Sequence, residues 1–289
     1  MKIIRKAGLL AVSLLALCHP ATAGDGKLLA TAGLTQVEGS GGGGIVPWAT
    51  INGYATKEQI SVSAFNTHVA VDDYQLNALG MSLSLFNRVE FSLARQSFDL
   101  PSAVIELGLG DEINQTIYGV KARLYGDLVY STWPQISFGI QHKKLADGAI
   151  AAAIGARESD RGTDYYLAAS KVHLGAAGGY NLIWNLTARA TQANQMGLLG
   201  FGSQTQESHQ VMLEASVGVL LSRKLAVGFE YRQKPDNLAA FKEDDWADIF
   251  ISYNPNKHFN ITLAWANLGN IAVADEQQGI YLSTTGYLW

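Results

Sequence analysis

The stretch Leu225-Ala226-Val227-Gly228-Phe229-Glu230-Tyr231-Arg232 carries a bulky apolar side chain at every second position. The residues between them are small or charged. A period of two is typical of a β-strand with one apolar and one polar face, whereas a helix repeats every 3.6 residues. The same alternation recurs at 259–266, at 134–141 and, with one exception, at 180–189. The chain is therefore predicted to be built from two-faced strands.

Segments of this kind recur along the whole chain and predict about fourteen strands. Most are 9–12 residues long, close to the 9–11 residues with which a tilted strand crosses the hydrocarbon of a bilayer. Each boundary is placed to within about two to four residues. The predicted strands are 27–37, 45–54, 58–68, 74–85, 88–98, 113–124, 133–142, 163–172, 179–190, 208–221, 225–234, 245–253, 258–268 and 279–288.

The connections between the predicted strands alternate in length. Short ones are 55–57, 86–87, 125–132, 173–178, 222–224 and 254–257, and the longer ones between them are 38–44, 69–73, 99–112, 143–162, 191–207, 235–244 and 269–278. Transmembrane barrels have short periplasmic turns and longer outer loops. The fold class predicted is all-β: an antiparallel up-and-down transmembrane β-barrel of about 14 strands, within a range of 12–16, with both termini at the periplasmic rim.

Charged residues in the predicted strands fall on the face opposite to the apolar one. Placing Lys or Arg against lipid near the bilayer midplane costs about 2–4 kcal/mol, so these charges are expected inside the barrel. A soluble barrel or sandwich also fits the period of two, but it leaves the bulky apolar face without a partner. The residues predicted to line the lumen are Glu90, Lys121, Arg123, Lys171, Arg189, Glu214, Glu230, Arg232 and Asp248.

The first residues have the parts of a signal peptide. An apolar run at 7–17 is too short to span a bilayer as a helix, and the small-x-small sequence Ala21-Thr22-Ala23 suits signal peptidase. The positive charges before it are Lys2, Arg5 and Lys6. Residues 1–23 are predicted to be cleaved, which leaves 24–289 as a single outer-membrane barrel domain.

The composition of the remaining chain excludes several classes of protein. Its net charge is 18 − 25 = −7, because three of the 21 basic residues and none of the 25 acidic ones lie in the signal. An acidic chain without basic runs is a poor ligand for nucleic acid. The single cysteine, Cys18, leaves with the signal, so no disulfide is expected. The partners expected are outer-membrane lipid and lipopolysaccharide, and the oligomeric state stays open.

The chain ends on Tyr287-Leu288-Trp289. A terminal aromatic residue with another two positions earlier is similar to the C-terminal signal read by the barrel-insertion machinery. Tyr287 and Trp289 are therefore predicted to form this signal, although Ser283 and Thr285 stand where a stronger signal has apolar residues.

Several stretches resemble a family of uncharacterised proteobacterial proteins known as domain of unknown function 3034. The resemblance covers nearly all of the mature chain and implies an exported outer-membrane protein, without implying a mechanism. It is carried by Gln36-Val37-Glu38-Gly39 and the glycines to Gly44, Pro47-Trp48-Ala49, Gly53-Tyr54, Ala193-Asn194-Gln195, the run 197–202, the run 221–228, Tyr231-Arg232, the run 234–238 and Glu243-Asp244-Asp245.

No pattern of a nucleotide, metal or catalytic site stands out in the sequence. The glycine runs lack the order of a phosphate-binding loop, and no two histidines are spaced as a metal pair. His68 beside Asp72 and Asp73, or His142 near the loop 143–162, leaves an outer-membrane hydrolase as the least favoured function. The acidic loop 235–244 suits either Ca²⁺ or plain solvation, and solvation is favoured. No catalytic residue, metal or cofactor is predicted.

The leading hypothesis is a pore for small polar solutes, because a barrel of this size with a polar interior is wide enough to hold water. Mixed charges in the lumen argue against a strong preference for anions or cations. The alternative is a non-conducting barrel that is structural or binds a partner through its outer loops. The loop 143–162 holds an alanine-rich run that suits a short helix, a constriction inside the barrel or an extra hairpin.

Overall fold

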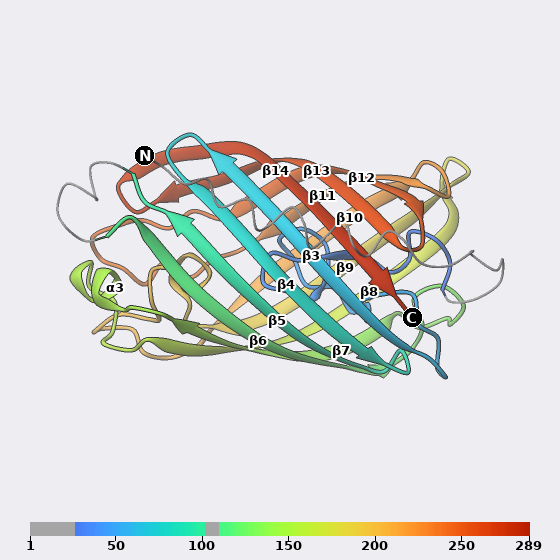
Figure 1. Cartoon of the computed structure of the whole chain (residues 1–289), viewed down its shortest axis with the longest axis horizontal. Coiled ribbons are helices and arrows are strands. Elements are labelled where there is room, and N and C mark those ends of the chain that lie inside the picture. The colour runs from blue at the N-terminus through green and yellow to red at the C-terminus, as the bar shows by residue number, and fades with distance from the viewer. Residues whose placement is uncertain (1–26, 102–109) are drawn as a thin grey trace, which may run out of the picture.

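In the computed structural model, which describes residues 27–101 and 110–289, twelve antiparallel strands close into one barrel (Figure 1). Each strand pairs with its neighbour in the chain, and β14 pairs with β3 to close the ring. The predicted fold class is confirmed, with a strand number at the lower end of the predicted range. The strands are β3 (Ile60–Val71), β4 (Gln75–Leu85), β5 (Val89–Asp99), β6 (Glu112–Tyr125), β7 (Gln135–Leu145), β8 (Arg161–Ala177), β9 (Tyr180–Thr191), β10 (Gln210–Leu220), β11 (Leu225–Arg232), β12 (Trp246–Asn256), β13 (Phe259–Ile271) and β14 (Ala274–Leu288).

The period of two in the sequence becomes the two faces of the barrel wall. In β13 the side chains of Leu263 and Trp265 are exposed on the outside, while those of Asn260 and Thr262 are buried inside. The same division holds around the ring, where large apolar residues face outward. An apolar exterior and a polar interior are what a barrel in a lipid bilayer requires. The chain is thus an outer-membrane type of β-barrel.

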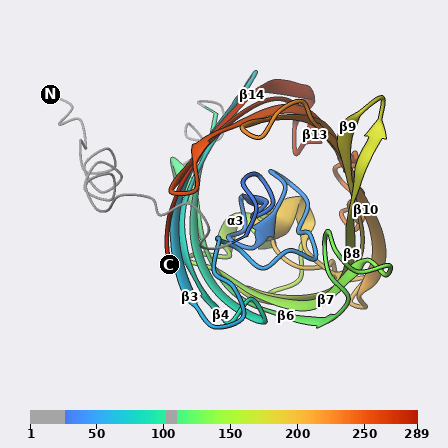
Figure 2. The same ribbon diagram turned by 90° about the vertical axis from the view of Figure 1, so that its right-hand side faces the viewer.

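The first two strands predicted, 27–37 and 45–54, are wrong. In this region the structure has only the two-residue strands β1 (Leu34–Thr35) and β2 (Gly41–Gly42), which pair with each other and not with the wall. Figure 2 looks along the barrel and shows this segment, in blue, inside the ring of strands. A wall strand needs one face against lipid, and here both faces are covered by protein. This removes two strands from the predicted fourteen.

The two rims of the barrel differ in the length of their connections. The rim that holds the C-terminal end of β14 and the start of β3 carries mostly short turns, such as the connections at 178–179 and 257–258. The opposite rim carries the loops 192–209 and 233–245 and the short helix α3 (Ala149–Ala153), which lies at the left end in Figure 1. The predicted loop 143–162 therefore contains no additional hairpin: its two ends extend the paired strands β7 and β8, and α3 lies between them. We refer to these ends as the short-turn rim and the long-loop rim.

Two predictions fall on residues outside the described part. These are the signal peptide at 1–23 and most of the predicted loop 99–112. Within the described ranges, no helix is long and apolar enough to cross a membrane.

Candidate functional site

Residues 31–55 fill the middle of the barrel, and we call this segment the plug. Apart from the partly exposed Gly33, every residue of the plug is buried. Both ends of the plug lie at the short-turn rim, where the backbone N–H of Lys27 donates to the carbonyl oxygen of Tyr54 over 2.8 Å. The plug is thus a loop that enters the lumen from the short-turn rim and returns to the same rim.

Glycines let the plug turn inside a narrow lumen. Gly39 has a φ of +92°, a conformation that residues with a Cβ rarely adopt. A Cβ on Gly43 would overlap the carboxylate of Glu230 on β11. The backbone at this point therefore lies directly against a charged side chain of the wall, which only glycine permits.

A ladder of alternating charges crosses the wall beside the plug. It consists of one inward residue from each of five consecutive strands, β7 to β11. Lys143 lies 2.7 Å from Asp164, Arg189 lies 3.2 Å from Asp164, and Arg189 lies 2.5 Å from Glu214. Arg232 ends the ladder 3.5 Å from Glu214. All five side chains are at most 4% exposed, so water screens none of these pairs.

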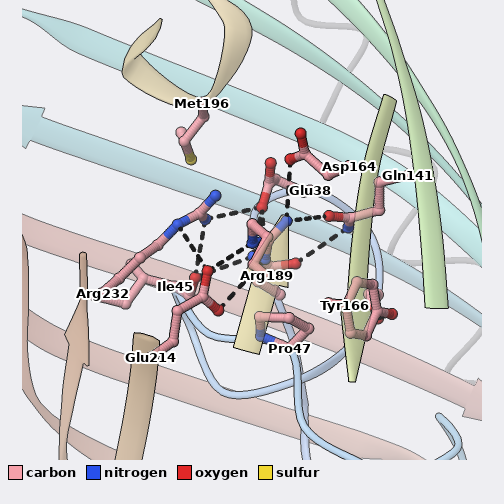
Figure 3. Close-up of polar contacts among 12 residues, drawn as sticks. Glu38, Ile45, Pro47, Gln141, Asp164, Tyr166, Arg189, Met196, Glu214 and Arg232 are labelled. Carbon is pink, nitrogen blue, oxygen red and sulfur yellow. Dashed lines mark hydrogen bonds and ion pairs between the residues drawn. The ribbon is translucent and has the colours of Figure 1, made fainter. Parts of the chain in front are cut away.

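Glu38 of the plug completes this ladder (Figure 3). Its carboxylate accepts a hydrogen bond from Nη1 of Arg232 at 2.8 Å, lies 3.6 Å from Nη2 of Arg189, and forms an ion pair with Lys143. Burial by itself raises the pKa of this carboxyl, but the cations Arg232, Lys143 and Arg189 outweigh burial and hold the pKa well below its usual value. Glu38 is therefore a fully buried carboxylate that stays ionised.

A second wall carboxylate, Glu90 on β5, accepts hydrogen bonds from the backbone of the plug. It accepts hydrogen bonds from the N–H groups of Gly41 at 2.9 Å and Asn52 at 2.7 Å. Lys121 on β6 lies 3.2 Å from Glu90 and donates to the carbonyl oxygen of Gly41 at 2.6 Å. This ion pair thus offers one acceptor and one donor to the plug.

A third wall carboxylate, Glu230 on β11, binds the plug without a cation. Its Oε2 accepts from the N–H groups of Gly44 at 2.6 Å and Ile45 at 2.9 Å, and its Oε1 lies 3.2 Å from Nε1 of Trp48. Asp248 is its directly opposite partner on β12. Among the ion pairs of the described residues, neither carboxylate has a cation.

The structure places the residues predicted to line the lumen in four groups. Arg189, Glu214 and Arg232 belong to the ladder, Glu90 pairs with Lys121, and Glu230 lies opposite Asp248. Arg123 and Lys171 lie apart near the short-turn rim: Arg123 pairs with Asp127 at 3.0 Å, and Lys171 donates to backbone carbonyl oxygens, including that of Ser131. Whether these charges select solutes stays a prediction.

Three members of the charged site were not predicted: Glu38, Lys143 and Asp164. Lys143 continues the inward parity of Gln141, but the predicted strand ended at 142. Asp164 shares the parity of the buried Tyr166 and was overlooked. Parity alone was enough to find both. Glu38 is different, because its position depends on the path of the plug, which no local pattern encodes.

The C-terminal aromatics contact the plug from the wall. The ring of Tyr287 packs edge-on against Tyr54 at 5.4 Å between centroids, and the ring of Trp289 lies 5.6 Å from that of Tyr54. Their role as an insertion signal stays a prediction.

Apolar side chains close the lumen at the long-loop rim. Met196, Leu198 and Leu199 fold inward and pack in one cluster with Tyr74 and Trp246 from the wall side. The cavity left between them measures about 20 Å³, which is about the space of one water molecule. Among the described residues, this cluster therefore closes the long-loop end of the barrel against solutes.

A buried ion pair holds the sealing loops together. Nζ of Lys234 lies 3.8 Å from Glu243, and Glu243 accepts the N–H of Gln195 at 2.9 Å. Burial raises the pKa of Glu243 to about 7, which Lys234 opposes, and burial lowers the pKa of Lys234 to about 8. Both groups therefore titrate near neutrality, and we call this pair with Gln195 the latch.

The short-turn rim is hollow by contrast. One cavity of about 780 Å³ lies there between Leu29, Val172 and Leu220, and another of about 410 Å³ lies between Lys27, Thr50 and Asp127. The short-turn side of the plug thus borders on open space, although the plug residues themselves are buried.

The histidines and acidic residues that were considered for catalysis or metal binding bond to other partners in the structure. His68 bonds Asn77 at 2.8 Å on the outer surface, and His142 bonds the hydroxyl of Thr163 at 2.9 Å there. In the acidic loop, Asp236 accepts the backbone N–H of Glu243. No group of three or more His, Cys, Asp or Glu residues able to hold a metal ion occurs in the described ranges.

The fold and the filled lumen define a transmembrane barrel of the outer-membrane kind with an internal plug. Residues 31–285 match the family described as protein of unknown function DUF3034, and the chain belongs to this family. This range begins at the first residue of the plug, so the family pattern includes the plug as well as the wall. A comparison with curated proteins finds no match.

Solved outer-membrane barrels are similar in fold. KdgM porin has a TM-score of 0.47 and 12% identity, with 78% of this chain and 98% of that chain covered. NanC porin has a TM-score of 0.49 and 9% identity, covering 79% and 100%. The outer membrane protein Omp33 of Acinetobacter baumannii has a TM-score of 0.47 and 8% identity, covering 81% and 100%. These likenesses concern the barrel fold alone.

Proposed function

We propose that this protein is a gated outer-membrane channel for small polar solutes, closed at rest by the plug. The observation that carries the proposal is the number of polar contacts between the plug and the wall, which accompany an apolar cluster that includes Leu34, Val46 and Trp48 of the plug. A barrel filled for structural reasons alone is most stable with an apolar core, because buried polar pairs rarely stabilise more than well-packed apolar groups. A wall of hydroxyls, amides and charges remains compatible with water once the plug leaves.

Several contacts illustrate this polarity. The carbonyl oxygen of Ala49 accepts from Gln135 at 2.5 Å and from Ser137 at 2.6 Å. The carbonyl oxygen of Pro47 accepts from the hydroxyl of Thr187 at 2.8 Å. Each of these wall groups can bond water instead of the plug, so withdrawal exchanges hydrogen bonds and does not leave them unmade.

The path of the plug favours release toward the short-turn rim. Both of its ends leave the barrel there, and the cavities at that rim provide room for movement. The opposite end is sealed by the apolar loop cluster. Opening therefore requires two events: withdrawal of the plug on one side and movement of the loop 192–209 on the other.

A disulfide that ties the plug to the wall tests this proposal. The hydroxyls of Thr35 on the plug and Thr285 on β14 are 3.4 Å apart, so Thr35→Cys with Thr285→Cys brings two thiols within bridging range after a small shift. Residues 24–289 contain no other cysteine. We expect single-channel currents in lipid bilayers, at raised voltage or in mild urea, when this variant is reduced, and silence when it is oxidised.

A wall-to-wall disulfide is the matched control. Thr67 and Ser283 are paired across β3 and β14 with their hydroxyls 2.8 Å apart. The variant Thr67→Cys with Ser283→Cys stiffens the wall and leaves the plug free, so its currents are expected to be the same in both redox states. If neither variant conducts when reduced, the gated channel is refuted.

A permanently closed barrel is the second candidate, and the sealed long-loop rim favours it. In that case the reduced variant stays silent, and the outer loops become the surface on which to look for a function.

A further inference from the structure

We propose that the charge ladder on β7 to β11 is a binding site for the carboxylate of a small anionic solute, and that Glu38 occupies this site in the closed state. The inference rests on the proposed channel and names the solute class for it. The observation behind it is that the cations belong to the wall and the carboxylate that they bind belongs to the plug.

The ladder has an odd number of charges and begins and ends with a cation. Lys143, Arg189 and Arg232 face only Asp164 and Glu214 within it. Within the ladder one positive charge is therefore in excess, and Glu38 neutralises it. When the plug leaves, the excess charge stays in the lumen without its carboxylate.

The geometry around Glu38 suits a carboxylate better than a larger or more highly charged anion. Two guanidinium groups and one ammonium group approach its two oxygens from β11, β9 and β7. Arginine pairs with planar carboxylates through directed N–H donors. A phosphate dianion would exceed the single positive charge that is available, whereas one carboxylate balances it.

The wall also supplies neutral groups that remain after the plug leaves. The side-chain oxygen of Gln141 accepts from Nη1 of Arg189 at 2.7 Å and keeps that guanidinium in place. Arg189 also lies over the ring of Tyr166, 5.5 Å from its centroid. The hydroxyl of Tyr166 bonds Ser40 of the plug at 2.9 Å, so withdrawal frees it for a solute hydroxyl or for water. The residues that form the site thus belong to the wall and remain in place when Glu38 leaves with the plug.

Chemical rescue tests this site without any channel measurement. Glu38→Ala removes the carboxylate and leaves a space that fits acetate. We expect acetate to raise the unfolding temperature of the detergent-solubilised Glu38→Ala barrel with saturation. Acetamide, which has the same shape without the charge, and chloride at equal ionic strength are expected to have no saturable effect. Glu58→Ala, which removes an exposed carboxylate near the plug, is the matched control and is expected not to respond to acetate.

Removing a cation identifies the site. Adding Arg232→Gln to Glu38→Ala is expected to weaken the apparent affinity for acetate at least tenfold. If Glu38→Ala refolds poorly, the folded fraction on a heat-modifiable gel is measured against acetate and acetamide concentration, and acetate alone is expected to restore it. Equal effects of acetate and acetamide, or an acetate effect that survives Arg232→Gln, overturn the proposal.

The binding-site proposal and the channel proposal can be refuted independently of each other. Acetate rescue in a barrel that never conducts supports the site and refutes the channel. Currents that pass through the reduced Thr35→Cys, Thr285→Cys variant, with no acetate rescue of Glu38→Ala, support the channel and refute the site.

Discussion

Two anchors hold the plug with opposite polarity, one at Glu38 and the other at Glu230. At the first, the plug supplies a carboxylate side chain and the wall supplies cations. At the second, the wall supplies the carboxylate and the plug supplies the backbone N–H groups of Gly44 and Ile45. The first anchor therefore depends on the identity of one plug side chain, and the second depends on the path of the plug backbone.

This difference predicts different sensitivities to substitution. A lost charge at Glu38 leaves the excess cation of the ladder buried without its counter-ion. A lost contact at Glu230 leaves two backbone donors without an acceptor, which costs less than an unpaired charge. The effects of the three substitutions are measured with one reporter, Thr35→Cys in the buried plug, where Thr35 is 1% exposed, and labelling of this thiol by a maleimide reports how often the plug leaves the lumen.

The largest effect is expected for Glu38→Gln. Removing one partner of a buried ion-pair cluster costs about 3–5 kcal/mol, and about 1.4 kcal/mol corresponds to a factor of ten in an equilibrium. Labelling of Thr35→Cys is therefore expected to rise by roughly a hundredfold or more. Glu58→Gln, an exposed change of the same kind, is expected to leave the rate unchanged, and equal rates for both variants would contradict the role of the charge.

A smaller effect is expected for Gly43→Ala, which breaks the second anchor by steric overlap. The new Cβ meets the Glu230 carboxylate, and forcing extra atoms into a packed interior costs about 1–3 kcal/mol. Labelling is expected to rise by roughly tenfold. Gly148→Ala is the control, because a Cβ there meets only ordinary contacts at 3.9 Å.

The wall of this barrel was predictable from the sequence, and its contents were not. All twelve wall strands were predicted, with the largest errors of five residues at the end of β8 and the start of β14, because each strand must present one apolar face to lipid and one polar face inward. The plug has no such constraint. Pro47 interrupts the predicted strand 45–54, since proline cannot donate to a strand ladder, and the residues on either side of it mix apolar and polar types on both parities. These two signals argue against a wall strand in 27–54.

The charged site likewise contains residues that the sequence pattern predicts and one that it does not. The parity of β9 and β11 was enough to place Arg189 and Arg232 inside the barrel. The partner that gives them a role, Glu38, lies about 150 residues or more away in the chain. Such a contact depends on how the whole barrel closes around the plug. The residues near Glu38 in the sequence therefore do not predict it.

Asp248→Asn is expected to hold the plug more firmly, unlike the two substitutions above. Asp248 lies directly opposite Glu230, and like charges in this position destabilise a strand pair by roughly 0.2–1 kcal/mol. Removing one charge is therefore expected to stabilise the second anchor and to slow labelling of Thr35→Cys by about two- to fivefold. Faster labelling would show that Asp248 holds the plug and does not strain it.

The smallest effect is expected from pH, through the latch at the long-loop rim. The groups that face Glu243 are Lys234, Asp236 and the N–H of Gln195. Because burial raises the pKa of Glu243 from 4.5 to about 7, its contribution to the closed loops is fully present below about pH 4.5. That contribution is lost as the pH rises through 7, where the folded site must hold a charge that the opened loop leaves in water.

Between pH 5.5 and 7.5, labelling of Leu199→Cys in the sealing loop is thus expected to accelerate by about two- to threefold beyond the ordinary pH dependence of the thiol. Each unit of pKa shift represents roughly 1.4 kcal/mol, but only the openings that expose Glu243 together with Leu199 carry this cost, which keeps the expected change small. Labelling of Glu243→Gln, which is neutral at both values, gives the thiol's own dependence. A wild-type latch that follows the same curve as Glu243→Gln would show that Glu243 does not control the loops. If the latch does respond while Thr35→Cys stays protected at both pH values, the outer seal and the plug move independently, as a barrel with two separate gates requires.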